Sequence, residues 1–169
     1  MAAKKKGGGK AAARSASRLA AVQALYQMDL AKTNLNDIIE EFTAIRLQGR
    51  DSDDDGQAVE LASADHTYFA ELVRGAVRRQ RDIDPLVDQQ LAAGWRLVRV
   101  DSILRAIFRA AVYELMDRID VPARVVINEY INVAHAFFSD DQPKVVNGLL
   151  DQIARELRPA EFSKAPVDN

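Results

Sequence analysis

Cysteine is absent from this chain of 169 residues, and histidine occurs only twice. A chain without cysteine has no disulfide, no thiolate nucleophile and no cysteine-ligated zinc, which is typical of an intracellular protein. His66 and His135 lie far apart in the sequence, and neither belongs to an HExxH zinc motif. We therefore expect a cytoplasmic protein with no metal site and no cofactor.

Signatures of membrane insertion and catalysis are also missing. No uncharged apolar run is long enough to span a membrane, and no glycine-rich phosphate loop follows a strand pattern. A Ser–His–Asp triad built from distant segments stays open, but no G-x-S-x-G motif argues for one. Glu114 and Glu129 fall in amphipathic helical patterns, where a solvated or salt-bridged carboxylate is much commoner than a catalytic one. The sequence therefore indicates a protein that is not an enzyme.

One acidic stretch imitates a metal-binding motif. The sequence DSDDDG at residues 51–56 begins like the calcium loop of an EF-hand. Such a loop needs a bidentate carboxylate at its twelfth position, which is Ala62 when the count starts at Asp51. Glu60 lies two places too early. We interpret the stretch as an exposed acidic loop and not as a calcium site.

The net charge of −2 is unevenly distributed along the chain. Residues 1–20 contain six basic residues and no acidic residue, so the remaining residues together carry −8. A basic arm on an acidic body favours an anionic partner bound at one end. On charge alone, a solvated tail that only aids solubility is an equally good interpretation.

Apolar residues recur at helical spacing from about Ser15 onward, and no segment alternates like a strand. The helices are predicted to begin near Ser15, at Thr33 or Asn34, at Asp65, shortly before Pro85, at Asp101, at Asp120, and at Asp140 or Asp141. The segment that contains Pro85 is expected to end near Gly94. The pattern predicts an all-α fold of about seven helices joined mostly by short loops.

The two ends of the chain differ from the helical region between them. Residues 1–13 are mostly Lys, Gly and Ala, with too little apolar bulk to pack, so we expect a disordered basic tail. Residues 14–159 are expected to form a single helical domain, and residues 160–169 a flexible C-terminal tail.

The dipeptide Asn147-Gly148 poses a local conflict. Asn-Gly between apolar residues is a strong hairpin signal, yet Val146, Leu149 and Leu150 keep helical spacing across it. We predict a helix here. Glycine inside a helix costs about 1 kcal/mol relative to alanine, so we expect Gly148 to allow a close helix contact that offsets this cost.

Three stretches together resemble one protein family. They read RLAAVQALYQMDL at residues 18–30, ILRAIFRAAVYELMDRIDVPARVVINEYINVAHAFF at 103–138, and KVVNGLLDQIARELRP at 144–159. Their order and wording resemble the NusB family of bacterial transcription antitermination factors, over about residues 14–159. The resemblance implies a non-catalytic, all-helical protein of two small subdomains, which we divide at about 14–82 and 83–159.

The resemblance also implies partners. Members of the family bind the boxA element of ribosomal RNA precursor transcripts together with the ribosomal protein NusE. The complex helps RNA polymerase to read through terminators. A small basic arm alone gives modest affinity, so a second RNA-binding subunit agrees with this partnership, because linked weak contacts multiply.

The expected RNA-binding residues follow from the same resemblance. The arginine-rich N-terminus of the family contacts RNA, and only Arg14 and Arg18 occupy that region here, with the Lys-rich tail up to Lys10 as an added source of charge. Lysine and arginine supply affinity by neutralising phosphates.

A second set lies around the start of the last helix. Phe137, Asp141 and Lys144 match positions that lie near RNA in family members, while Pro143 departs from the commoner polar residue. A ring such as that of Phe137 can stack on a base, and the carboxylate of Asp141 can accept a hydrogen bond from a base amino group.

Three other interpretations stay open. NusB-like domains also occur at the N-terminus of ribosomal RNA cytosine-5 methyltransferases, but those proteins need a further α/β domain and a nucleophilic cysteine, which these 169 residues do not provide. The chain could instead be a purely protein-binding helical module. An apolar groove between helices would serve a homodimer or NusE equally well.

Overall fold

The computed structural model describes residues 5–46, 64–91 and 100–163, and these residues form helices and no strand. The α-helices are α1 (Lys5–Ala31), α2 (Leu35–Glu41), α4 (His66–Arg78), α5 (Gln80–Gln90), α6 (Ser102–Asp117), α7 (Ala123–Phe137) and α8 (Gln142–Leu157). A π-helical turn, η1 (Phe42–Arg46), follows α2, and a 3₁₀ turn, η3 (Pro159–Glu161), follows α8. The predicted all-α fold is confirmed.

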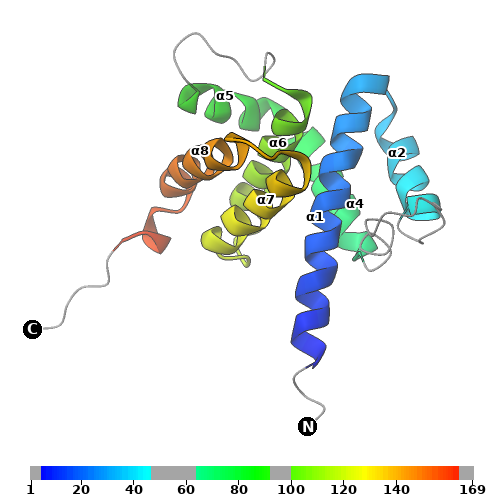
Figure 1. Ribbon diagram of the computed structural model, residues 1–169, viewed down its shortest axis with the longest axis horizontal. Helices are drawn as coiled ribbons and strands as arrows, with labels where there is room; N and C mark the ends of the chain where they lie inside the picture. Colours follow the sequence, from blue (N-terminus) through cyan, green and yellow to red (C-terminus); the bar gives the residue numbers. More distant parts are fainter. Residues whose placement is uncertain (1–4, 47–63, 92–99, 164–169) are drawn as a thin grey trace, which may run out of the picture.

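Helices α1 and α6 organise the core. Helix α1 packs against α4, α6 and α7, while α6 also contacts α4, α5, α7 and α8. Figure 1 shows α2 on one side of α1 and the pair α7 and α8 on the other. The apolar stripes of these helices meet in one continuous core, in which Phe42 of η1 stacks on Phe69 of α4 with ring centroids 5.5 Å apart.

Polar residues cap three of the helices as predicted. The side chains of Asn34, Asp65 and Asp101 each accept a hydrogen bond from a backbone N–H in the first turn of α2, α4 and α6, respectively. The predicted cap at Asp120 is wrong, because Pro122 stands at the start of α7 and Asp120 instead accepts from Arg118. Asp141 begins α8 without a capping bond from its side chain.

Both ends of the ordered chain extend beyond the expected domain. The segment expected to be a disordered tail, residues 1–13, is helical from Lys5 onward, which corrects the expected start at residue 14. Two features support the helix: alanine is the best helix former, and a distant segment contacts it, because the carbonyl of Ala13 accepts from the backbone N–H of Asp65 at 3.3 Å. The first turns of α1 extend past the other helices (Figure 1).

The C-terminal residues 160–163 also differ from the expected flexible tail. The turn η3 follows α8 directly, and Phe162 packs against the core with the guanidinium of Arg155 4.8 Å from its ring centroid. The predicted subdomain boundary, at residues 82 and 83, falls inside α5 and not in a linker. The division into two subdomains stays a prediction.

Gly148 does not mark a close helix contact. Helix α8 runs through the pair Asn147-Gly148 as predicted, but a Cβ built at Gly148 would meet no atom within 4 Å. The expectation of tight packing there is wrong. The close approach is at Gly75 in α4, where a Cβ would lie 2.1 Å from the ring of Tyr113 in α6.

Two sequence features lie outside the described residues: the acidic stretch at 51–56 and the expected helix end at Gly94. Within the described ranges, no helix is long and apolar enough to cross a membrane. Among the same residues, no group of three or more His, Asp or Glu side chains is placed to hold a metal ion.

Candidate nucleic-acid interface

Arg18 lies in the interior and not on the surface. It falls on the apolar stripe of α1, only 2% of the residue is exposed, and its guanidinium makes a two-pronged contact with Glu114 of α6. The Nε and Nη2 atoms donate to the two carboxylate oxygens at 2.9 and 3.0 Å. Glu114 is fully buried. The role of Arg18 as a direct RNA contact stays a prediction, and the structure engages its Nε and Nη2 atoms in the core and brings Nη1 to 3.5 Å from Glu129.

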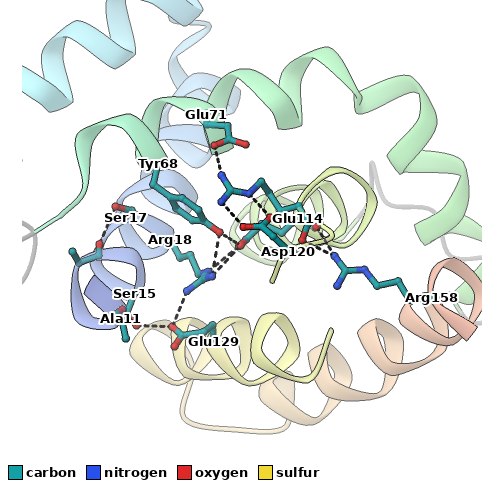
Figure 2. A network of polar contacts seen from close by, with 12 residues as sticks. Ala11, Ser15, Ser17, Arg18, Tyr68, Glu71, Glu114, Asp120, Glu129 and Arg158 are labelled. Carbon is teal, nitrogen blue, oxygen red and sulfur yellow. Dashed lines mark hydrogen bonds and ion pairs between the residues drawn. The ribbon is translucent and has the colours of Figure 1, made fainter. Parts of the chain in front are cut away.

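Tyr68 of α4 completes this buried cluster (Figure 2). Its hydroxyl donates to the carboxylate of Glu114 and accepts from Nη2 of Arg18 at 3.2 Å. Burial, then the negative charge and hydrogen bond of Glu114, raise the pKa of the Tyr68 hydroxyl. Burial opposes the charge of Arg18, but the hydrogen bond and the charge of Glu114 outweigh it and raise the arginine pKa. The raised pKa keeps the Tyr68 hydroxyl protonated, so it remains a hydrogen-bond donor to the Arg18–Glu114 salt bridge.

Arg118, at the end of α6, holds the loop between α6 and α7 against this cluster. Its guanidinium lies 4.9 Å from the ring centroid of Tyr68 and donates to Glu71 at 2.6 Å and to Asp120 at 3.0 Å. The hydrogen bond from Arg118 lowers the pKa of the Asp120 carboxyl. The bond to Asp120 fixes the loop that leads into α7.

Arg158 is a structural residue that the sequence reasoning missed. It is 7% exposed, and its guanidinium donates to four backbone carbonyls at the end of α6 and in the following loop. The acceptors are Glu114, Leu115, Arg118 and Val121. The carbonyls of Glu114 and Arg118 also accept from the backbone N–H groups of Arg118 and Val121, so Arg158 adds a second donor there and fixes the end of α6 and the loop that follows. The position of Arg158, directly after a helical pattern and before Pro159, is only a weak signal of this role, since it does not reveal that the side chain caps a different helix, α6.

Arg14 is the cation that this arrangement leaves available. It lies one turn before Arg18 on α1, half-buried, with its guanidinium carbon 4.7 Å from the ring centroid of Tyr68. Its Nε atom is buried without a hydrogen-bond partner, and the described residues provide no carboxylate within ion-pair distance of it. Arg14 is thus oriented by a cation–π contact and makes no salt bridge within the described residues, although its charge contributes to the lowered pKa of the nearby Asp120 carboxyl.

A surface depression adjoins Arg14. It has a volume of about 320 Å³ and lies between the first half of α1 and the start of α7. Its lining consists of Lys10, Ala11, Arg14, Arg18, Asp120, Val121, Pro122, Val125 and Glu129. Lys10 is exposed. The predicted residues Lys10 and Arg14 therefore line one depression together with Arg18 of the buried cluster.

Glu129 of α7 links that depression to the core. Its Oε2 accepts from the hydroxyl of Ser15 at 2.7 Å and lies 3.5 Å from Nη1 of Arg18 (Figure 2). The side chain is 23% exposed. Both Glu114 and Glu129 are thus ion-paired, which confirms the salt-bridged interpretation of these two carboxylates.

The other predicted RNA-binding residues do not line this depression. Phe137, at the end of α7, is half-buried against the core. It lies eight residues after Glu129, about 12 Å farther along the helix. Asp141 and Lys144 are almost fully exposed and 3.9 Å apart at the start of α8. The structure thus forms two separate groups from the predicted residues.

Comparison with known proteins agrees with this architecture. The NusB family profile matches residues 15–155. A transcription antitermination protein NusB from Rhodopseudomonas palustris (strain TIE-1) is 48% identical over 159 residues, which cover 94% of this chain and 88% of that protein. Its counterpart from Bartonella tribocorum is 50% identical over 145 residues, covering 86% and 90% of the two chains.

A solved structure extends the agreement to three dimensions. NusB from T. maritima superposes with a TM-score of 0.69 at 28% sequence identity, covering 88% of this chain and 96% of that one. The matched residues 15–155 include Arg18, Glu114 and Glu129, which join α1, α6 and α7. Sequence, fold and relatives agree, and the chain belongs to the NusB family.

Proposed function

We propose that this protein is a transcription antitermination factor that binds the boxA element of ribosomal RNA precursor transcripts. It does so with the ribosomal protein NusE and promotes read-through by RNA polymerase in the cytoplasm. The relatives' names support the antitermination role. The observation that carries the RNA-binding role is Arg14, a cation oriented on the ring of Tyr68 whose Nε has no hydrogen-bond partner.

Lys10 and Arg14 are the residues that neutralise RNA phosphates in this proposal. Arginine on a rigid helix loses little conformational freedom on binding, because the ring of Tyr68 already orients the guanidinium. Arg18 acts differently: it positions Tyr68 and Glu129 from within the core and does not touch RNA. The role is binding without a chemical reaction.

Phe137, Asp141 and Lys144 form the second part of the proposed surface. Lys144 supplies a further phosphate contact, and the accessible part of Phe137 supplies a stacking surface. Asp141 is so exposed that its contact with Lys144 contributes little to stability, so both side chains are free to change partner. Two separate weak contacts on one strand raise the overall affinity.

The test is binding of a boxA RNA and a scrambled RNA across salt concentrations, with and without NusE. We expect tighter and more selective binding with NusE. Arg14→Ala should weaken RNA binding severalfold and lower the log–log salt slope by about 0.7, the loss expected for one phosphate contact on a single strand. Its melting temperature should stay near that of the wild type.

Arg74→Ala is the matched control, because Arg74 is an exposed arginine on α4. It should leave both affinity and salt slope unchanged. Equal affinity for the two RNAs even with NusE present would contradict boxA recognition and favour a purely protein-binding module. Equal losses in the two arginine variants would show that only net charge matters.

A further inference from the structure

The depression beside Arg14 contains both signs of charge, and this limits what it can bind. Lys10 and Arg14 line it together with the carboxylates of Glu129 and Asp120. A phosphate placed inside would meet these two carboxylates at short range, which is unfavourable. The phosphate-binding cations and the interior of the depression therefore suit different parts of one ligand.

Glu129 is a fixed hydrogen-bond acceptor at this place. Its Oε2 is engaged by Ser15 and faces Arg18, so the side chain is held from two sides. Its Oε1 has no hydrogen bond within the described residues. An ionised carboxylate is acceptor-only, so the group that satisfies Oε1 must be a donor.

An apolar wall stands next to this acceptor. Pro122 and Val125 line the same depression, and Val125 is 42% exposed. A flat ring can cover apolar surface of this kind while its edge reaches a polar group. Cations for a phosphate, an apolar wall for a ring and an acceptor for a donor edge together describe a nucleotide whose base enters the depression.

We propose that this depression holds one base of the bound RNA and that Glu129 selects a base with an exocyclic amino group. Adenine, cytosine and guanine present such a donor, whereas uracil presents carbonyl oxygens at the corresponding positions. The inference rests on the proposed RNA-binding function and adds a specificity-determining residue to it. Ser15 and Arg18 are positioning residues that hold Glu129.

The experiment measures the affinity of short oligomers of adenylate, cytidylate and uridylate for the wild type and for Glu129→Gln. The amide keeps the size of the side chain and can turn its NH₂ group toward the depression while its oxygen accepts from Ser15. We expect the wild type to prefer the two amino-bearing oligomers. In Glu129→Gln the ratio of adenylate to uridylate affinity should fall by roughly three- to tenfold, as for loss of one base-edge hydrogen bond.

Glu40→Gln is the matched control, an exposed glutamate on α2 that should leave the ratio unchanged. If Glu129→Gln lowers the melting temperature, a second measurement on the wild type tests the inference. It compares the affinity of an adenylate oligomer with that of an oligomer of unsubstituted purine nucleotides, which lack the amino group. Equal affinity for those two oligomers overturns the inference. An unchanged ratio of adenylate to uridylate affinity in folded Glu129→Gln also overturns the inference, but it leaves the RNA-binding proposal intact. If the wild type binds no RNA even with NusE present, the RNA-binding proposal itself is refuted.

Discussion

Arg18 shows that a basic residue in a basic segment can belong to the core. The pair with Glu114 is nearly inaccessible to water. The attraction between the two charges is the main interaction that compensates each side chain for its lost hydration. Such a pair adds little when compared with well-packed apolar residues, but removing one partner is costly. The pair therefore specifies how α1 and α6 meet more than it strengthens the fold.

Arg18→Ala should destabilise the fold by about 3–5 kcal/mol, because it leaves Glu114 as an unpaired buried charge. Denaturant unfolding followed by circular dichroism measures the loss. Arg74→Ala, on the surface, should change stability by less than about 0.5 kcal/mol. A fully stable Arg18→Ala variant that has lost RNA binding would contradict this assignment and restore Arg18 as a surface contact.

Helices α4 and α8 show two opposite uses of glycine. In α4, Gly75 lets the ring of Tyr113 lie where a Cβ would otherwise be, and the Tyr113 hydroxyl donates to Glu71 one turn away at 3.2 Å. In α8, Gly148 faces open space. The sequence marked the second glycine by its neighbour Asn147, although only the first has a packing role.

Gly75→Ala should lower the free energy of unfolding by about 1–3 kcal/mol, since the new methyl group would overlap the Tyr113 ring. Gly148→Ala should raise it by up to about 1 kcal/mol, because alanine favours the helix and meets nothing. The two variants carry the same chemical change and serve as controls for each other. Thermal or denaturant unfolding that gave the same sign for both would contradict the packing described here.

At the scale of the whole molecule, one polar cluster connects four helices. Arg18 of α1, Tyr68 of α4, Glu114 of α6 and Glu129 of α7 form a continuous chain of hydrogen bonds and ion pairs from the core to the depression (Figure 2). The elements far apart in sequence are therefore tied together at the point where the proposed RNA site begins. This continuity couples the stability of the fold to the geometry of the site.

Stability should fall as the pH rises above 10. Burial and neighbouring carboxylates raise the pKa of Tyr68, Tyr113 and Tyr130 above the ordinary value of 10.0. Above pH 10 the unfolded chain loses these protons while the folded chain keeps them, so the free energy of unfolding decreases with pH. Below pH 10 the contribution is fully present.

Denaturant unfolding from neutral pH to above pH 10 measures this slope, and tyrosinate absorbance follows the titration. Tyr68→Phe removes one of the three groups, so its curve should fall less steeply than that of the wild type. Identical slopes for the two proteins would contradict the raised pKa of Tyr68.

Much of the architecture follows from local pattern. Apolar residues at helical spacing predict the helices, and Asn34, Asp65 and Asp101 predict three starts correctly, because a cap depends on residues within one turn. Asp120 fails as a cap since Arg118 competes for its carboxylate. The helical residues 5–13 and the packed Phe162 were also missed, because contacts with distant segments order both ends.

The sequence by itself determined the helical class and the charge of the N-terminal arm, since each depends on residues close together along the chain, and the order of three sequence stretches indicated the family. Only the tertiary structure decided which arginine faces outward. Arg14 and Arg18 are four residues apart and thus share one side of α1. Three helices enclose Arg18, whereas Arg14 lies one turn nearer the projecting end of α1, where fewer neighbours surround it. The burial of each arginine depends on which distant helices pack around it, and the local sequence pattern does not predict that packing.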